Sequence, residues 1–269
     1  MPERLDILAN PRATRVRYVA GLSRRSARQR HGQFLVEGPQ AVRELLAHAP
    51  SLVRDVYTTP AVAERERGPL ASARRAGLWV HEVTPEVAEA MSPDAQGILA
   101  VASLPVSPGV AALRGARLAV LLPEVSDPGN AGTLLRIADA AGADVVVVCR
   151  GGVEVTNPKV VRASAGSLFH LPVVTGVSFE AAAAAARAAG LRLVGADAHS
   201  RRDVFSAARL HEPTAWVFGH EARGLSPAER AACDELLAVP LYGAAESLNV
   251  AAAAAICLYA AARAQRSGA

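Results

Sequence analysis

Two segments in the second half of the chain, residues 118–122 and 144–149, are apolar throughout apart from the opening Asp144. A strand that faces solvent on one side alternates apolar and polar residues, so unbroken apolar runs predict strands that are buried on both faces of a sheet. Residues 130–141 between them have the apolar spacing of a helix, and Gly142 follows at the C-terminal end. This strand–helix–strand order predicts a parallel sheet covered by helices.

The alternation of strands and helices extends along the rest of the chain. After residue 150, strands are predicted at 191–195, 215–218 and 236–240, and helices at 179–189, 227–233 and 247–263. Before residue 104, strands are predicted at 33–37, 53–58, 78–83 and 97–101, with helical spacing at 16–22, 39–47 and 61–76. The predicted fold class is α/β, with a small N-terminal domain at 1–103, a linker at 104–115 rich in proline and glycine, and a C-terminal domain at 116–269.

The composition excludes several familiar ligand-binding loops. The chain has 269 residues, of which 51% are hydrophobic and 20% charged, as in a globular protein. Its only lysine, Lys159, follows a proline and precedes a valine, so a Walker A loop is absent. No two glycines stand two positions apart, which excludes the Gly-x-Gly core of a dinucleotide fingerprint, and no serine has the flanking glycines of a hydrolase nucleophile elbow.

Charge and cysteine content indicate the compartment. Residues 1–30 hold eight arginines against Glu3 and Asp6, while the whole chain has a formal charge of +4. The three cysteines, Cys149, Cys233 and Cys257, are far apart, which favours a reducing cytosol over disulfides or a zinc site. The N-terminus lacks the apolar core of a signal peptide, and the longest uncharged apolar run, residues 250–262, is too short for a bilayer. We therefore expect a soluble cytoplasmic protein.

Three segments hold more polar and turn-forming residues than the packed elements around them need. Residues 123–132, which lead to Arg136, follow a buried strand and open a helix at the sheet edge where open α/β folds bind ligands. Residues 218–225 place two glycines and an acid–base pair after another strand, and residues 239–249 enter the last helix. Taken singly, each segment is equally well explained as a capped turn, a plain loop or a helix cap.

Taken together, the three segments resemble one family in their order and spacing. They are similar to the three motifs of the SpoU/TrmH group, the RNA ribose 2′-O-methyltransferases of the SPOUT superfamily. Motif one matches Asn130-x-Gly132-x-x-x-Arg136-x-Ala138, and motif two matches Gly219-x-Glu221-x-x-Gly224-Leu225. Motif three matches Pro240-Leu241 with Ser247-Leu248-Asn249-Val250. Residues 162–167 and 169–172 match a segment found between motifs one and two, and residues 28–46 resemble the small RNA-binding domain of the family. One departure is Ala251, where serine is frequent.

The resemblance implies a fold and a cofactor that periodicity alone does not reveal. In the family, the C-terminal domain is a parallel sheet with a trefoil knot (the α/β knot), and the loops of the knot bind S-adenosylmethionine without a metal. The positions that match its cofactor-binding residues are Gly219, Val239, Leu241, Leu248 and Ala196. The family acts as a homodimer, and the apolar terminal helix at 250–262 would suit that interface, although a helix in the core of a monomer would have the same composition.

The resemblance also implies the catalytic residues. A ribose 2′-hydroxyl must displace S-adenosylhomocysteine from the methyl group, so the protein has to align the reacting atoms and handle a weakly acidic proton. Arg136 matches the arginine assigned to this step. Because a guanidinium group has a pKa above about 12, we favour positioning and charge stabilisation over proton abstraction. Asn130, Ser247 and Asn249 would orient Arg136, the ribose and the cofactor, and Glu221 would hold an arginine by a charge-assisted hydrogen bond.

The predicted substrate is a structured RNA. Arg24, Arg25, Arg28 and Arg30 of the basic segment are candidates for contact with RNA phosphates, although a solvated basic face would have the same sequence. By analogy, the two-domain layout favours 23S ribosomal RNA over transfer RNA, for routine modification or antibiotic resistance. The alternatives are a transfer RNA 2′-O-methyltransferase and an RNA-binding protein that has lost catalysis; the intact motifs argue against the latter.

Overall fold

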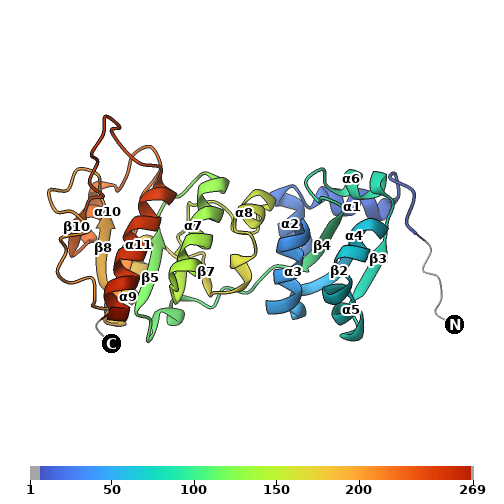
Figure 1. Ribbon diagram of the computed structural model, residues 1–269, viewed down its shortest axis with the longest axis horizontal. Coiled ribbons are helices and arrows are strands. Elements are labelled where there is room, and N and C mark those ends of the chain that lie inside the picture. The colour runs from blue at the N-terminus through green and yellow to red at the C-terminus, as the bar shows by residue number, and fades with distance from the viewer. Residues whose placement is uncertain (1–6, 268–269) are drawn as a thin grey trace. The chain divides into compact units, whose positions relative to one another are not determined.

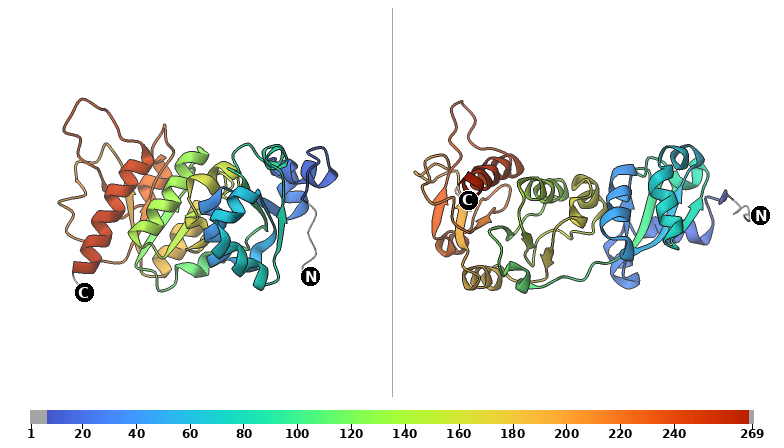
Figure 2. Two further views of the ribbon diagram at one scale, coloured as in Figure 1. Left: turned by 45° about the vertical axis from the view of Figure 1, so that its right-hand side comes forward. Right: turned by 60° about the horizontal axis from the view of Figure 1, so that its bottom comes forward.

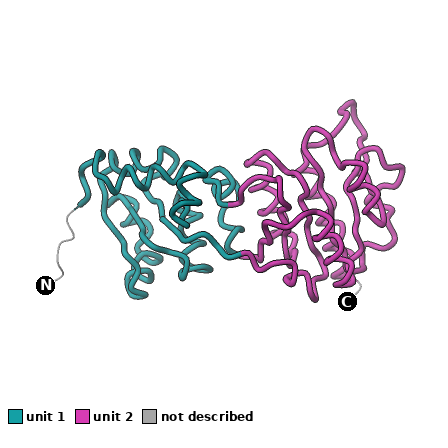
Figure 3. The backbone as a smooth tube through the Cα atoms, turned by 180° about the vertical axis from the view of Figure 1, so that it is seen from behind, with its two compact units in different colours: residues 1–106, 156–169 teal, residues 107–155, 170–269 magenta. Residues whose placement is uncertain are grey.

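The computed structural model describes residues 7–267, and these divide into two compact units that are described separately below. Unit 1 comprises residues 7–106 and 156–169, and unit 2 comprises residues 107–155 and 170–267 (Figure 3). The segment 156–169 belongs to unit 1, although the sequence analysis placed it in the C-terminal domain. Glu3, Arg4 and Asp6, counted above in the basic segment, lie outside the described residues.

Unit 1 is built on a mixed four-stranded sheet in the order β1-β4-β2-β3. The strands are β1 (Gln33–Glu37), β2 (Val53–Thr58), β3 (Trp79–Glu82) and β4 (Ile98–Ser103). β2 and β3 are parallel, whereas β4 runs antiparallel to β1 and to β2. All four strands were predicted from the sequence: the bounds of β1 and β2 match, and those of β3 and β4 differ by one or two residues.

Seven helices of unit 1 surround this sheet (Figure 1): α1 (Thr14–Gly21), α2 (Arg25–His31), α3 (Pro39–His48), α4 (Pro60–Arg65), α5 (Arg67–Arg75), α6 (Pro85–Met91) and α8 (Pro158–Ala163). The single helix predicted at 61–76 is wrong, because the backbone leaves the helical conformation at Glu66 and separates α4 from α5. The sequence analysis did not predict α2. It also missed α6 and α8. Each begins with a proline after a capping side chain, Thr84 or Asn157, so the start signal is present in the sequence.

The N-terminal helices belong to the core of unit 1. Val16, Val19 and Leu22 are fully buried and pack in one cluster with Leu35 and Tyr57 of the sheet. The basic segment is therefore not a free arm in its described part, since its apolar side chains hold it against the sheet.

Arg28 is a correction to the predicted RNA contacts. Its side chain is 2% exposed, and its guanidinium group donates to the carbonyl oxygens of Leu22 (3.1 Å) and Ser23 (2.8 Å). A buried guanidinium that satisfies backbone carbonyls stabilises the turn between α1 and α2, so it does not offer its charge to RNA. Arg24, Arg25 and Arg30 are exposed.

Unit 2 is built on a six-stranded sheet in which every pair of neighbours is parallel, in the order β10-β8-β9-β5-β6-β7. The strands are β5 (Leu118–Leu122), β6 (Val145–Val148), β7 (Val173–Thr175), β8 (Arg192–Ala196), β9 (Thr214–Val217) and β10 (Glu235–Leu237). β5 and β6 are buried at every residue, which confirms the prediction from their unbroken apolar runs. The short strand β7 was not predicted.

Helices cover both faces of this sheet (Figure 2). Alternate residues of β5, Ala119 and Leu121, share a core cluster with α9 (Phe179–Ala188). On the other face, α7 (Pro128–Ala141) and α11 (Val250–Ser267) pack side by side. A further short helix, α10 (Pro227–Ala232), begins at a capping box formed by Ser226 and Glu229. This arrangement brings the loops after β5, β8, β9 and β10 to the carboxyl edge of the sheet.

Across residues 7–267, every helix is too short or too polar to cross a membrane.

Candidate active site

The first motif forms the start of α7, directly after the buried strand β5. Asp127 caps the helix, since its Oδ1 accepts a hydrogen bond from the backbone N of Asn130 (2.7 Å), and Pro128 occupies the first turn. The helix begins at Pro128, two residues earlier than the sequence analysis predicted, so Arg136 lies about two turns from its start.

Glu221, from the loop after β9, connects the second motif to the first. One carboxylate oxygen accepts from the backbone N of Asp127 (3.0 Å) and the side-chain amide of Asn130 (3.4 Å), and the other accepts from the hydroxyl of Ser126 (3.2 Å). Burial alone would raise the pKa of Glu221, but hydrogen bonds from backbone N–H groups and from Asn130 lower it below its usual value. Glu221 is therefore a carboxylate that fixes the loop before α7.

Within one chain, the described residues give Glu221 no arginine partner, so the predicted pairing stays a prediction. Among the described residues its hydrogen-bond partners are N–H and O–H groups, and the imidazole Nδ1 of His220 lies 3.9 Å from its carboxylate. The neighbouring Arg223 pairs instead with Glu124 (2.7 Å). The N–H groups before a helix have no partner within the helix, and the carboxylate of Glu221 satisfies one of them.

Asn249 connects the third motif to the same network. Its side-chain amide donates to Oδ1 of Asn130 (3.0 Å), while its own Oδ1 accepts from the backbone N of Ala251 (2.8 Å) at the start of α11. A continuous chain of hydrogen bonds thus runs from Glu221 through Asn130 to Asn249. It brings together three residues that are separated by 91 and 119 positions in the sequence.

Gly219 allows the loop of the second motif to fold back on itself. His220 and Gly224 exchange backbone hydrogen bonds of 3.0 and 2.8 Å, which closes a tight turn. A Cβ atom at Gly219 would collide with the backbone of Gly224 and lie 2.6 Å from the N atom of Leu225. Glycine is therefore required here for the shape of the loop itself, in addition to any space that it leaves for a ligand.

A pocket of about 240 Å³ opens between the second and third motifs. Its lining includes all five residues predicted to bind the cofactor: Ala196, Gly219, Val239, Leu241 and Leu248. The last two are about two-fifths exposed, so the segment after β10 presents uncovered apolar side chains to this space. Such a lining suits a flat apolar ring held by a few polar groups.

Asp197 and His220 are pocket residues that the sequence analysis missed. Asp197 follows β8 directly and is buried; its Oδ2 atom forms an ion pair with Arg230, and its Oδ1 accepts from the backbone N of His199 (3.1 Å). His220 accepts from the backbone N of Ala222 (3.0 Å) at Nδ1, and its Nε2 lies 3.4 Å from the hydroxyl of Ser126. Their position in the sequence could have identified them as candidates, because each follows the carboxyl end of a buried strand, where open α/β sheets bind ligands.

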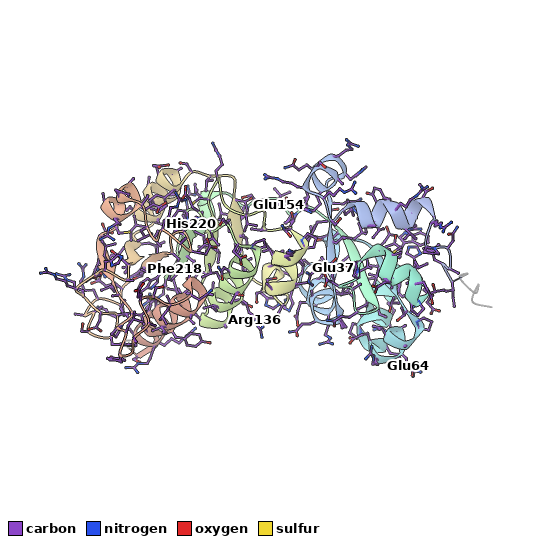
Figure 4. The ribbon with its side chains drawn as sticks, turned by 90° about the horizontal axis from the view of Figure 1, so that it is seen from above. Glu37, Glu64, Arg136, Glu154, Phe218 and His220 are labelled. Atoms are coloured by element: carbon purple, nitrogen blue, oxygen red, sulfur yellow. The ribbon has the colours of Figure 1, made fainter. Side chains whose placement is uncertain are left out.

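Ser247 and Arg136 lie apart from the hydrogen-bond chain. Ser247 lines the pocket and is exposed, and within the described residues it has no hydrogen bond to Asn130 or Asn249. Arg136 is exposed on α7, pairs with no group of the described chain and does not line the pocket. Figure 4 shows it well apart from Phe218 and His220, which lie at the pocket. Of the four polar residues predicted to surround one reaction centre, Asn130 and Asn249 therefore meet within one chain, whereas Ser247 and Arg136 are not part of their network.

These features match a known family along most of the chain. Residues 117–259 match the SpoU rRNA Methylase family, and residues 13–100 match the MRM3-like substrate binding domain. A parallel-sheet domain with the three motifs at its carboxyl edge, preceded by a mixed-sheet domain, defines an RNA methyltransferase of this class. The chain belongs to the SpoU rRNA methylase family.

Several relatives are similar over nearly their full length. The chain is 34% identical over 267 residues to the 23S rRNA (uridine(2479)-2′-O)-methyltransferase of Streptomyces viridochromogenes, which covers 92% of this chain and 88% of that protein. It is 35% identical over 240 residues to the 23S rRNA (guanosine(2553)-2′-O)-methyltransferase RlmP of Bacillus subtilis, covering 88% and 92%. Among solved structures, the SpoU methyltransferase AviRb from Streptomyces viridochromogenes in complex with AdoMet is similar with a TM-score of 0.82 and 34% identity, covering 96% of this chain and 100% of that one.

Proposed function

We propose that the protein transfers a methyl group from S-adenosylmethionine to a ribose 2′-hydroxyl of 23S ribosomal RNA in the cytoplasm. The observation that carries this proposal is the hydrogen-bonded chain Glu221–Asn130–Asn249 beside a pocket lined by all five predicted cofactor residues. The relatives named for 23S ribosomal RNA cover both units, which supports this substrate over transfer RNA. The three described cysteines are free thiols, as a reducing compartment allows.

The residues of the pocket fit S-adenosylmethionine. Val239, Leu241 and Leu248 offer apolar surface to an adenine ring. Asp197 lines the same pocket, and its buried carboxylate, which is paired with Arg230 at Oδ2, can accept a further hydrogen bond from a hydroxyl or amino group of the cofactor. When bound, the cofactor supplies a methyl group on a positively charged sulfur, which carries the driving force for transfer.

Arg136 is the residue that we assign to the ribose. Its exposed guanidinium group, without a partner in the described chain, is free to donate to an RNA phosphate and to the 2′-hydroxyl oxygen. This contact would hold the hydroxyl in place and stabilise the negative charge that develops on its oxygen. The network of Glu221, Asn130 and Asn249 fixes the start of α7, and Arg136 lies about two turns further along the same helix.

A homodimer would bring Arg136 to a pocket. Arg136 does not line the pocket of its own chain. We therefore assign it to the cofactor pocket of a second copy of the protein. The face that α7 and α11 share exposes Tyr259, whose side chain is 53% exposed and whose hydroxyl donates to the carbonyl of Ala140 (3.2 Å). An aromatic ring on an otherwise alanine-rich helix suits a symmetric contact between two such faces.

The direct test is methyl transfer in vitro, followed by mapping in cells. Purified protein with radiolabelled S-adenosylmethionine should label 23S ribosomal RNA from cells that lack the gene. Mapping of 2′-O-methyl groups should then locate one nucleotide that is methylated in cells with the gene and unmethylated in cells without it. Label in transfer RNA alone would favour the transfer RNA alternative. RNA binding without any transfer would favour a protein that has lost catalysis. Calorimetry with S-adenosylmethionine, with and without a chelator, should give the same affinity, since no step proposed here uses a metal.

A further inference from the structure

Trp79 is a large aromatic side chain on the surface of unit 1. It opens β3, the edge strand of the mixed sheet, and 66% of its surface is exposed. The only other tryptophan of the chain, Trp216, is fully buried. Burial of an apolar indole ring away from water is favourable in free energy. A ligand that covers the exposed ring therefore binds more tightly by that amount.

The rings next to Trp79 are stacked in series. The imidazole of His81 lies parallel to the indole, with an angle of 6° between the planes and 6.3 Å between the ring centres. The phenol of Tyr57 continues the series at 5.1 Å and 23° from His81. Tyr57 is buried and the side chain of His81 is 19% exposed, so Trp79 is the outermost and most exposed ring of this aromatic series.

A shallow groove of about 600 Å³ surrounds this ring, within unit 1. Its lining includes Trp79 and His81 together with three charged side chains from α1 and β2: Arg15, Arg54 and Asp55. The ring therefore stands in a concave surface that also carries basic groups. That combination is the one used to bind single-stranded nucleic acid, in which bases stack on aromatic rings while cations follow the backbone.

The single acid in the groove is neutralised by its neighbours. Asp55 accepts from Arg15 (2.5 Å) and contacts His81 (2.7 Å), and Arg15 also donates to the hydroxyl of Tyr57 (2.7 Å). Burial alone would raise the pKa of Asp55, but the hydrogen bond with His81 and the charge of Arg15 lower it, so the carboxylate stays ionised and paired.

Arg54 is the basic side chain that remains free to bind a ligand. Its Nε donates to the hydroxyl of Ser103 (2.7 Å), which fixes the stem of the guanidinium group. Its two terminal amino groups have no partner in the part of the chain that the structure describes. They are therefore available to a phosphate at the rim of the groove.

We propose that this groove binds one unpaired nucleotide of the RNA substrate, with its base stacked on Trp79 and its phosphate paired with Arg54. The inference deepens the proposed function, because it rests on RNA being the substrate and assigns a recognition site for it outside the methyl-transfer pocket. An unpaired base is required, since bases inside a duplex have both faces covered by their neighbours.

The two tryptophans provide a direct optical test. Titration with single-stranded twelve-nucleotide oligoadenylate should quench the red-edge emission that comes from the exposed Trp79, whereas the buried Trp216 should keep its emission. A twelve-base-pair RNA duplex should quench much less at equal concentration. In the W79F variant, in which Trp216 is the only tryptophan, oligoadenylate should leave the emission unchanged. Equal quenching by duplex and single strand, or by adenosine monophosphate at the same nucleotide concentration, would contradict the assignment to an unpaired RNA nucleotide.

Substitutions separate stacking from a structural role. Trp79→Ala should weaken binding of oligoadenylate about 5- to 150-fold, the range measured for loss of one base–aromatic stack, whereas Trp79→Phe should retain most of the affinity. The matched control is Phe205→Ala, because Phe205 is an aromatic of nearly equal exposure, 64%, in unit 2 and outside both proposed sites. Arg54→Ala should lower the salt dependence of binding by about 0.7 in the log–log slope, as loss of one phosphate contact predicts.

The outcomes for this site and for the proposed function are separable. If Trp79→Ala binds oligoadenylate and 23S ribosomal RNA as tightly as wild type, the nucleotide site is wrong, even where methyl transfer is intact. If wild type shows no methyl transfer to any RNA but Trp79 is still quenched by single strands, the proposed function fails and the nucleotide site stands. With both correct, Trp79→Ala should raise KM for ribosomal RNA, while kcat and the affinity for S-adenosylmethionine stay near wild type.

Discussion

Arg136 differs from the other polar residues of the motifs because no group of the described chain fixes its side chain. A residue that makes no stabilising contact is removed at little cost to the fold, so its loss reports on chemistry alone. Arg136→Ala should lower the single-turnover rate of methyl transfer by about 100-fold or more, the usual effect of removing a donor that stabilises developing charge. The melting temperature and the affinity for S-adenosylmethionine should stay unchanged. A wild-type rate in this variant would exclude Arg136 from the mechanism.

Arg136→Lys distinguishes positioning from proton abstraction. Lysine keeps the positive charge but lacks the planar pair of donors, and its ordinary pKa of about 10.4 makes it easier to deprotonate than arginine. If Arg136 acts by positioning, the lysine variant should remain nearly as slow as the alanine variant at every pH. A rate that recovers as the pH approaches about 10 would instead support proton abstraction. The pH–rate profile under single-turnover conditions measures the difference.

Glu221 predicts a pH dependence of stability. Since its folded pKa lies below the ordinary value of 4.5, its contribution to stability is present above that pH and is lost as the pH falls through the folded pKa. Glu221→Gln should therefore destabilise the protein at neutral pH, and its difference from wild type in free energy of unfolding should shrink below about pH 4.5. Urea unfolding at several pH values tests this. A difference that is constant with pH would mean that the charge of Glu221 does not matter to the loop.

At the scale of elements, the loop of the second motif depends on one glycine. Gly219→Ala places a Cβ against the backbone of Gly224 and Leu225, so the loop must shift. We expect a loss of about 1–3 kcal/mol in stability, as for other overpacked sites, and a weaker affinity for S-adenosylmethionine by calorimetry. Gly68→Ala is the matched control, because Gly68 lies in α5 and a Cβ there meets nothing within 4 Å. Equal effects of both substitutions would remove the special role of Gly219.

The sequence predicted the principal strands because their signals are local. Unbroken apolar runs identified β5 and β6, and the helical spacing at 39–47 identified α3, in which Pro39 occupies the first turn. The break at Glu66 between α4 and α5 has no such signal, since both halves have helical spacing. The five pocket residues were located through the resemblance to a family and not through periodicity.

Contacts between distant residues lay beyond local signals. The hydrogen bond between Asn130 and Asn249 depends on where the loop after β10 returns, which no spacing in the sequence encodes. Arg28 could not be told from its exposed neighbours, because an arginine that satisfies carbonyls of a turn has the same local sequence as one that binds phosphate. The knot implied by the resemblance stays a prediction, and general topology rules would have argued against it.

At the scale of the whole molecule, the burial of Val16, Val19 and Leu22 changes how the basic segment should be tested. Deletion of residues 1–30 would expose the core of unit 1 and confuse unfolding with loss of RNA contacts. Combined alanine substitution of Arg24, Arg25 and Arg30 keeps the helices and removes three exposed charges. If all three contact phosphates, the log–log salt dependence of RNA binding should fall by about 0.7–0.9 for each. An unchanged slope would identify them as a solvated face.

The placement of Arg136 outside its own pocket makes the homodimer testable by complementation. Arg136→Ala leaves the pocket intact, while Leu248→Arg blocks the pocket but leaves Arg136 in place. Each variant alone should be inactive. If a symmetric dimer supplies Arg136 to the pocket of its partner, mixed dimers hold one complete site, and random exchange of subunits should restore about a quarter of wild-type activity. If Arg136 serves its own pocket, no mixed dimer holds a complete site and the mixture stays inactive. Sedimentation of the wild type at the assay concentration confirms that dimers are present, and a monomer there would contradict the assembly itself.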